Sequence, residues 1–248
     1  MTVLDSIISA NKLNNKQLAV LIDPDKTDEI KLRSISTLAV ENKVDYFFVG
    51  GSLLVNNYID HCIKNLKELT GIPVVLFPGN TMQISRHADA ILFLSLISGR
   101  NPEMLIGRHV IAAPYLRQTS LEVIGTGYML IESGRPTAVS YMSHSVPIPS
   151  DKDDIAMCTA IAGEMLGLKL IYMDAGSGAE KTINASMIEL VRKSISIPII
   201  AGGGINTPEK AMTVAQAGAD VIVIGNIIEK EPAMLKEIAS AIKFRKTK

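Results

Sequence analysis

Eight apolar, mostly β-branched runs alternate with helix-like segments along the sequence, and this alternation predicts a (β/α)8 barrel. The runs are apolar without interruption, as expected for parallel strands that are buried on both faces. A doubly wound open sheet is the alternative. Two features favour the barrel. The loops after the early strands are short, and the seventh and eighth strands both end in glycine, where such barrels commonly bind phosphate.

The expected strands share a high content of valine, isoleucine and leucine, and most are followed by glycine, proline, asparagine or aspartate. They span residues 17–23, 44–50, 73–79, 88–95, 127–133, 169–176, 197–203 and 219–225.

Helical spacing of apolar residues separates most of these strands. Thr27 is expected to cap the first helix, and Gly71 is expected to end the second one in the left-handed conformation. Pro208 and Pro232 lie near the first position of the last two helices, where a missing N–H costs little. The expected helices span residues 27–42, 56–71, 150–167, 184–196, 207–219 and 231–246.

Two regions lack a regular pattern. Residues 100–125 carry only a short helical pattern, and residues 134–149 form a long insertion that contains three prolines. Long loops inside compact domains are usually functional. Because no linker or repeat interrupts the chain, we expect a single domain over residues 1–248.

Composition excludes several classes of protein. The chain has 248 residues, and its 25 basic and 25 acidic residues balance, which argues against a nucleic-acid-binding protein. We expect Cys62 and Cys158 to be buried free thiols, since they are far apart in the sequence. Neither a signal peptide nor an apolar run of membrane-spanning length is evident, so we expect a cytoplasmic protein.

Glycine-rich turns follow three consecutive strands, the sixth, seventh and eighth. Glycine lets backbone N–H groups converge on an anion, and the following helices add their positive ends. Each turn alone could be structural, but together the three predict a site for a phosphate monoester. The residues are Gly176, Ser177, Gly178, Gly203, Gly204, Gly225 and Asn226.

Paired acids end the first strand. Asp23 and Asp25 flank Pro24, and Ser52 follows the second strand. Hard Mg2+ favours such oxygen ligands and keeps several waters, so Asp23 and Ser52 are candidate metal ligands. The alternative is that Asp23 caps the following turn. The four histidines have no metal-like spacing, and His144 either lines the site or is exposed.

These strand ends resemble those of the geranylgeranylglyceryl phosphate synthase family, which includes the bacterial heptaprenylglyceryl phosphate synthases. The similar pieces are LIDPDK, FVGGS, VLFPGN, YMDAGSGA, IAGGGI and VIVIGN, which run in family order from residue 21 to residue 226. The stretch ESGRPTAVSYMSHSVPIP is more similar to the second sequence group, found in archaea and some bacteria.

The resemblance implies a modified barrel in which an irregular segment replaces the third helix. It also implies an Mg2+-dependent prenyltransferase, commonly oligomeric, that joins sn-glycerol 1-phosphate to a polyprenyl diphosphate. By motif position, Asp23 and Ser52 would hold the metal, and Asp174 would accept the hydroxyl proton, although some members have glutamate there. The implied glycerol phosphate site comprises Tyr172, Met173, Asp174, Ala175, Gly176, Ser177, Gly178, Gly203, Gly204, Gly225 and Asn226.

The polyprenyl tail needs an apolar groove, and the group resemblance favours a geranylgeranyl chain. One candidate wall lies in the segment that we assign to the replaced helix, although its residues could equally be ordinary core. They are Leu96, Ile97, Met104, Leu105 and Tyr115. Candidate diphosphate ligands are Lys26, Arg100 and Lys181.

Other barrel proteins share the phosphate site. A sugar-phosphate isomerase or epimerase usually needs an acid–base pair, yet Lys26 is the only lysine or histidine at a strand end. An FMN-binding oxidoreductase would be yellow when purified. A non-catalytic relative would not be expected to keep Asp23, Ser52 and Asp174 together.

Overall fold

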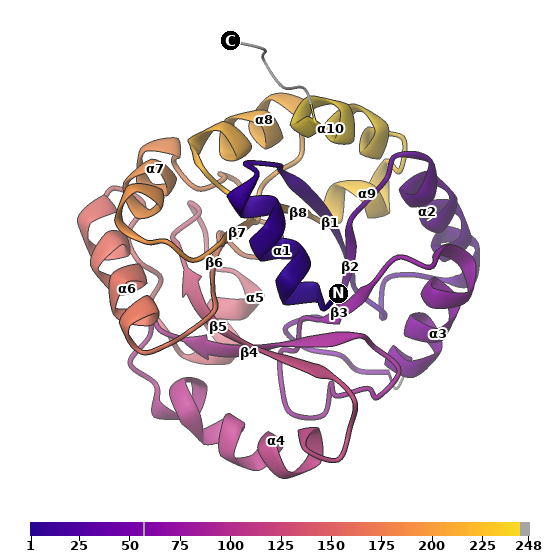
Figure 1. Ribbon diagram of the computed structural model, residues 1–248, viewed down its shortest axis with the longest axis horizontal. Coiled ribbons are helices and arrows are strands. Elements are labelled where there is room, and N and C mark those ends of the chain that lie inside the picture. The colour runs from indigo at the N-terminus through magenta and orange to yellow at the C-terminus, as the bar shows by residue number, and fades with distance from the viewer. Residues whose placement is uncertain (57, 244–248) are drawn as a thin grey trace.

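The structure is a computed structural model that describes residues 1–56 and 58–243. Within these residues, eight parallel strands close into a barrel in chain order, with β8 paired to β1 (Figure 1). The (β/α)8 prediction is confirmed, and the open sheet is wrong. The strands are β1 Gln17–Ile22, β2 Tyr46–Val49, β3 Val74–Leu76, β4 Ala90–Leu96, β5 Glu122–Leu130, β6 Leu170–Asp174, β7 Ile199–Gly202 and β8 Val221–Ile224.

Helices surround the barrel (Figure 1). All six expected helices are present, with ends that differ by a few residues. The helical elements are α1 Val3–Lys12, α2 Glu29–Glu41, α3 Ile59–Thr70, the π-helical turn η1 Glu103–Gly107, α4 Arg108–Leu116, α5 Ala138–Ser143, α6 Asp153–Met165, α7 Ala185–Ser194, α8 Pro208–Ala217, α9 Asn226–Lys230 and α10 Met234–Lys243.

The core has two layers because successive strand side chains point to opposite faces. On β1, Leu18 and Val20 pack against the surrounding helices, whereas Ala19 points into the barrel. The barrel interior also contains Phe48 and Tyr172, which explains why the strands read as continuous apolar runs.

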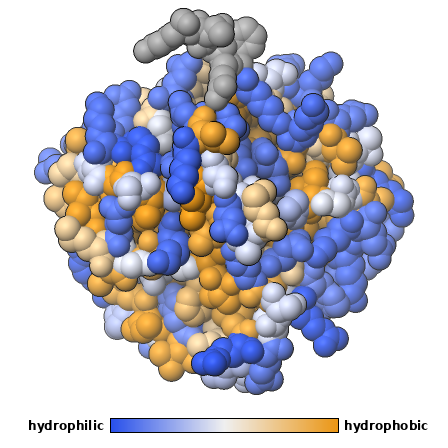
Figure 2. All heavy atoms as spheres, in the orientation of Figure 1, coloured by the Kyte–Doolittle hydropathy of each residue, from blue (hydrophilic) through white to orange (hydrophobic). Residues whose placement is uncertain are grey.

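Helix α1 closes the end of the barrel that faces the viewer in Figure 1. Its Val3 and Ile7 pack with the barrel interior. The Glu122 carboxylate, at the start of β5, accepts hydrogen bonds from the N–H groups of Val3 and Leu4 at 2.6 and 3.1 Å. The opposite end, where the strands terminate, is therefore the open one. Figure 2 shows the α1 face, on which apolar residues lie in patches among polar ones.

The third barrel helix is absent, as the family resemblance implies. The chain between β3 and β4, residues 77–89, is described in full and contains turns but no helix. Our placement of the replaced segment after β4 was wrong, however. Residues 103–116 form η1 and α4, whose side chains pack beside β4; for example, the Ser95 hydroxyl donates to the Leu105 carbonyl at 3.0 Å.

Several local details differ from expectation. Asp28, and not Thr27, caps α2, because its carboxylate accepts from the N–H of Lys31 at 2.8 Å. Both cysteines are free, but Cys158 is exposed rather than buried. Gly71 ends α3 in the left-handed conformation, as predicted. Residues 244–246 of the last expected helix, and Asn57 of the second, lie outside the described residues.

No helix in the described part of the chain is both long and apolar enough to cross a membrane.

Candidate active site

A polar cavity of about 410 Å3 opens where the strands terminate. Loops that follow β1, β2, β5, β6, β7 and β8 contribute to its wall, so motifs that are distant in sequence meet there. The expected site residues that line this cavity are Asp23, Ser52, Tyr172, Asp174, Gly176, Ser177, Gly178, Gly203, Gly204, Gly225 and Asn226.

The side chains along β6 and the residue that follows it alternate between the two faces of the sheet. The side chains of Tyr172 and Asp174 line the cavity. Met173 and Ala175, also expected in the glycerol phosphate site, point to the outer layer and are buried against the helices. The N–H of Ala175 is also engaged, since it donates to the Gly202 carbonyl at 3.0 Å. Neither residue therefore lines the cavity.

Asp174 is held in one orientation at the end of β6. Its Oδ2 accepts a hydrogen bond from the Tyr128 hydroxyl at 2.5 Å, and its Oδ1 accepts one from the N–H of Gly176 at 2.8 Å. Burial raises the pKa of Asp174, and these two hydrogen bonds oppose the rise because they stabilise the carboxylate. Burial and the Asp174 charge raise the pKa of Tyr128, which keeps the phenol protonated as a donor.

The turns after β6 and β7 contact each other through their backbones. Gly203 and Gly204 have φ of +85° and +68°, values that other residues rarely adopt. A Cβ on Gly203 would lie 2.7 Å from the Gly176 nitrogen, and one on Gly204 would lie 2.7 Å from the Lys181 carbonyl oxygen. Only glycine fits at these two positions, which explains the sequence pattern.

Several amide groups of these turns are available to a ligand. Among the described residues, no acceptor is present for the backbone N–H groups of Ser177, Gly178, Gly203 and Gly204. Converging N–H groups of this kind form a concave site for an anion. The Ser177 hydroxyl also donates to the Asn226 side-chain oxygen at 3.2 Å, which joins the turn after β6 to the end of β8.

Arg135, from the loop after β5, completes this side of the cavity. Its guanidinium donates from Nε to the Gly178 carbonyl at 2.9 Å, and also from Nη2 to the same oxygen. This contact joins residues 43 positions apart and was not predicted.

The opposite side of the cavity carries the candidate metal ligands. Asp23 directly follows β1, and the loop after β2, which contains Ser52, lies next to it in the cavity lining. A Cβ on Gly51 would lie 3.5 Å from Asp23 Oδ2, so the two strand ends are in contact. One carboxylate and one hydroxyl beside open space suit Mg2+, which keeps waters and binds substrate phosphates. The described residues contain no cluster of three or more His, Cys, Asp or Glu side chains suited to a metal.

Lys26 and Glu229 place further charges beside Asp23. The Lys26 ammonium lies 2.7 Å from Asp23 Oδ2. Burial lowers the pKa of Lys26, but the hydrogen bond and charge of Asp23, with the charge of Glu229, outweigh burial and raise it. Asp25 does not line the cavity. Its carboxylate accepts from the N–H groups of Val55 and Asn56 at 2.6 and 3.2 Å and anchors the loop after β2.

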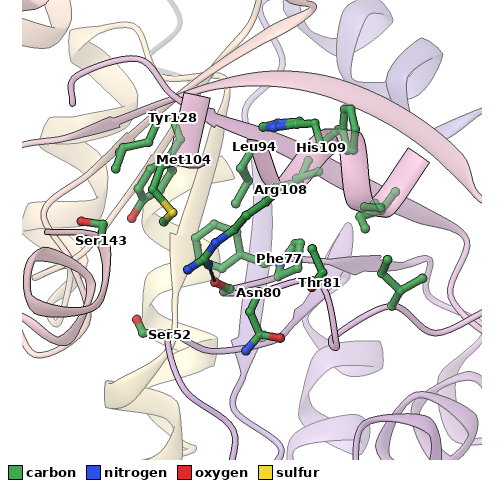
Figure 3. A pocket seen from close by; sticks show the side chains of 18 of the residues that line it. Ser52, Phe77, Asn80, Thr81, Leu94, Met104, Arg108, His109, Tyr128 and Ser143 are labelled. Atoms are coloured by element: carbon green, nitrogen blue, oxygen red, sulfur yellow. Dashed lines mark hydrogen bonds between the residues drawn. The ribbon is translucent and has the colours of Figure 1, made fainter. Parts of the chain in front are cut away.

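A second, apolar pocket of about 130 Å3 lies beside the polar cavity, between β4, α4 and the loop after β3 (Figure 3). Ser52 and Phe77 line both, so the two spaces are adjacent at that wall. Two residues of the expected groove wall, Leu96 and Met104, line the pocket. Ile97, Leu105 and Tyr115 do not line it.

Two polar side chains of α4 enter this apolar pocket (Figure 3). Arg108 reaches the loop after β3, where its Nη1 donates to the Gly79 carbonyl at 2.8 Å. His109 packs edge-on against Phe93, with ring centres 4.3 Å apart. Burial lowers the pKa of His109, which favours the neutral ring.

Sequence reasoning missed four residues of this region. Tyr128 lies inside a strand, Gln83 lies in a loop without a motif, and His109 lies in a helix that was not expected. Arg135 lies in the stretch that resembles the second sequence group, but it was not singled out as a ligand. Gln83 joins two loops, because its side-chain oxygen accepts from the N–H groups of Gly51 and Gly79 at 3.3 and 3.0 Å. Of the candidate diphosphate ligands, Lys26 lines the polar cavity, whereas Arg100 and Lys181 do not. His144 is exposed.

Known proteins resemble this chain over nearly its whole length. Residues 11–242 match the PcrB family. Geranylgeranylglyceryl phosphate synthase from Chitinophaga pinensis is 55% identical over 240 residues, which cover 97% of this chain and 95% of the relative. The enzyme of that name from Spirosoma linguale is 50% identical and covers 92% of both chains.

Solved structures agree with the sequence relatives. The crystal structure of (S)-3-O-geranylgeranylglyceryl phosphate synthase from Thermoplasma acidophilum, in complex with its substrate sn-glycerol-1-phosphate, superposes with a TM-score of 0.93. Its chain is 34% identical to this one, and the alignment covers 98% of this chain and 99% of the other.

Proposed function

The chain belongs to the PcrB family, and we propose that it joins sn-glycerol 1-phosphate to a polyprenyl diphosphate through an ether bond, with release of diphosphate. Geranylgeranyl diphosphate is the proposed donor, because the relatives at 50–55% identity are named for that chain. The observation that carries the proposal is one polar cavity beside an apolar pocket. The glycine turns after β6, β7 and β8, called the glycine cradle below, line this cavity together with the buried carboxylate of Asp174 and the candidate metal ligands Asp23 and Ser52.

The glycine turns hold the phosphate of glycerol phosphate. Their unpaired N–H groups and the side chain of Asn226 face the same space as Asp174. A phosphate bound there leaves the glycerol hydroxyls directed into the cavity. The proposed acceptor substrate is also the one that the Thermoplasma acidophilum enzyme binds.

Asp23 and Ser52 would hold Mg2+ on the other side of the cavity. When bound, the metal would supply positive charge that stabilises the departing diphosphate. Lys26, which already contacts Asp23, adds a cation at the same place. The two phosphate-bearing groups are thereby assigned to opposite walls, which keeps their negative charges apart.

Transfer requires one bond to break and one to form. The bond between the allylic carbon and the diphosphate oxygen breaks, and the electron pair leaves with the diphosphate. The free hydroxyl oxygen of glycerol phosphate then forms the ether bond to that carbon, and Asp174 accepts the hydroxyl proton. The buried carboxylate suits this role because burial raises its pKa and so increases its basicity.

Three aromatic rings lie where the polar cavity and the apolar pocket adjoin. Phe77 and Tyr172 are stacked with ring centres 4.9 Å apart, and Tyr128 lies edge-on to Tyr172 at 5.5 Å. Ring faces attract cations, so this cluster favours the positive charge that develops on the allylic carbon. The polyprenyl tail would enter the apolar pocket behind Phe77.

Assembly and location are also proposals. We expect a homo-oligomer in the cytoplasm, with transient contact at a membrane surface when the lipid product leaves. The isomerase and FMN alternatives receive no support from the relatives, which are named as the prenyltransferase.

The direct test is product formation by the purified protein. Glycerol 1-phosphate is incubated with diphosphates of C15 to C35 chains, with Mg2+ or with EDTA, and the ether is identified by mass spectrometry. We expect ether with Mg2+, most rapidly from the C20 donor, and none with EDTA. Absence of ether from every donor would reject the transferase proposal, and a yellow preparation would favour the FMN alternative.

A further inference from the structure

We infer that Arg135 is a direct ligand of the phosphate monoester in the glycine cradle, an inference that rests on the proposed function. Arg135 lies in the loop between β5 and α5 and lines the polar cavity. The sequence predicts phosphate binding there through the backbone N–H groups of the glycine turns and the positive ends of the following helices. The structure also places a guanidinium on the rim of the turn after β6.

The contact with Gly178 leaves most of the guanidinium free to bind. Arginine has five N–H donors, and the Gly178 carbonyl receives one from Nε and one from Nη2. The three remaining N–H groups have no acceptor among the described residues. The fork is already oriented by the two bonds that it makes, so a phosphate oxygen meets a preorganised donor group.

The charge of Arg135 is also uncompensated. Within the described part of the chain, no carboxylate lies within 4 Å of its guanidinium nitrogens, whereas the Lys26 ammonium is paired with Asp23. A phosphate monoester carries about −1.5 to −2 charges at neutral pH. Among the described residues, Arg135 and Lys230 are thus the cavity-lining cations without a carboxylate within 4 Å, and Arg135 is the one that is hydrogen-bonded to the turn after β6.

Arg135 and the cradle converge on one point. The position that a Cβ would take on Gly178 lies 3.1 Å from Arg135 Nη2 and 3.9 Å from Asn226 Nδ2. Two side chains, from the loop after β5 and from the end of β8, thus lie beside Gly178. This wall is the glycerol phosphate side, because Asp23 and Ser52 stand on the opposite wall. We therefore assign Arg135 to the monoester and not to the diphosphate.

Calorimetric titration with glycerol 1-phosphate and with inorganic phosphate tests the assignment. The proteins are the unchanged chain, Arg135→Gln, Arg135→Lys and the control Lys181→Gln, a basic residue that does not line the cavity. We expect Arg135→Gln to weaken glycerol 1-phosphate binding about tenfold or more, as for loss of a hydrogen bond to a charged group. Arg135→Lys should recover part of the loss, and Lys181→Gln should bind as the unchanged chain does.

A purely structural tether predicts a different pattern. If Arg135 only anchors its loop to Gly178, glutamine and lysine should be equally poor, and the salt dependence of binding should not change. Three results would each overturn the assignment. They are equal glycerol 1-phosphate affinities in Arg135→Gln and Arg135→Lys, an unaltered affinity in Arg135→Gln, or a loss confined to the binding of Mg2+ and pyrophosphate. If the unchanged chain binds neither glycerol 1-phosphate nor phosphate, the proposed function itself fails. If the unchanged chain binds them and Arg135→Gln binds equally well, only the assignment of Arg135 fails.

Discussion

Replacing Tyr128 with phenylalanine should move the pH dependence of catalysis in a defined direction. The change removes one hydroxyl, which donates to Asp174 Oδ2 at 2.5 Å, and keeps the ring that packs against Tyr172 and Phe77. The hydroxyl stabilises the charged carboxylate, so its loss raises the pKa of Asp174 beyond the rise that burial already causes.

The size of the effect follows from the strength of that hydrogen bond. A hydrogen bond to a charged group contributes about 1.5 to 3 kcal/mol, and 1.36 kcal/mol corresponds to one pH unit. Because Asp174 must be deprotonated to accept the hydroxyl proton, activity falls as pH drops through its pKa. The acidic limb of the profile should therefore move upward by about one to two pH units.

The assay is kcat/KM for glycerol 1-phosphate measured across pH, since this ratio reports the free enzyme. Tyr46→Phe is the matched control, because Tyr46 is a buried tyrosine whose hydroxyl bonds to Ser6 and Gln17 at the closed end of the barrel. The control should leave the limb in place. An acidic limb that stays fixed in Tyr128→Phe, or moves to lower pH, would refute the assignment of Asp174 as the base.

Three further substitutions test the other parts of the site. Asp23→Ala should abolish turnover and Mg2+ binding while leaving the circular dichroism spectrum intact; unchanged activity would remove Asp23 from the metal site. Gly204→Ala forces a Cβ to within 2.7 Å of the Lys181 carbonyl at φ +68°, at a cost of about 1 to 3 kcal/mol. It should both lower Tm and raise the KM for glycerol 1-phosphate, whereas Gly71→Ala, also at φ +68° but with nothing within 4 Å, should lower Tm alone. Equal KM values in the two glycine variants would contradict the cradle. Met104→Trp should fill part of the apolar pocket and shift donor preference from C20 towards C15. The control Ile106→Trp, at an exposed position, should leave donor preference unchanged. A preference for longer chains after Met104→Trp would place the tail elsewhere.

The strands were predictable because parallel barrel strands are buried on both faces and therefore read as continuous apolar runs. The helix after β4 was not. Pro102, Gly107 and Pro114 interrupt its sequence, and glycine and proline lower local helix propensity. Packing beside β4 nonetheless makes residues 103–116 helical, and tertiary contacts of this kind leave no local signal.

The candidate site was predictable where its residues follow strands directly. Asp23, Ser52 and the glycine turns line one cavity because parallel strands of a barrel all end at the same rim. The period of two along β6 could also have separated Tyr172 and Asp174 from Met173 and Ala175. Side chains that reach the site from elsewhere, such as Tyr128 and Arg135, depend on distances that only the folded chain defines.

A crystal structure of the protein with glycerol 1-phosphate and Mn2+, located by its anomalous scattering, would test the central arrangement most directly. We predict phosphate oxygens within hydrogen-bonding distance of the N–H groups of Gly178 and Gly204, a glycerol hydroxyl at Asp174, and the metal at Asp23. A phosphate bound outside the glycine turns, or a metal bound away from Asp23, would contradict the account.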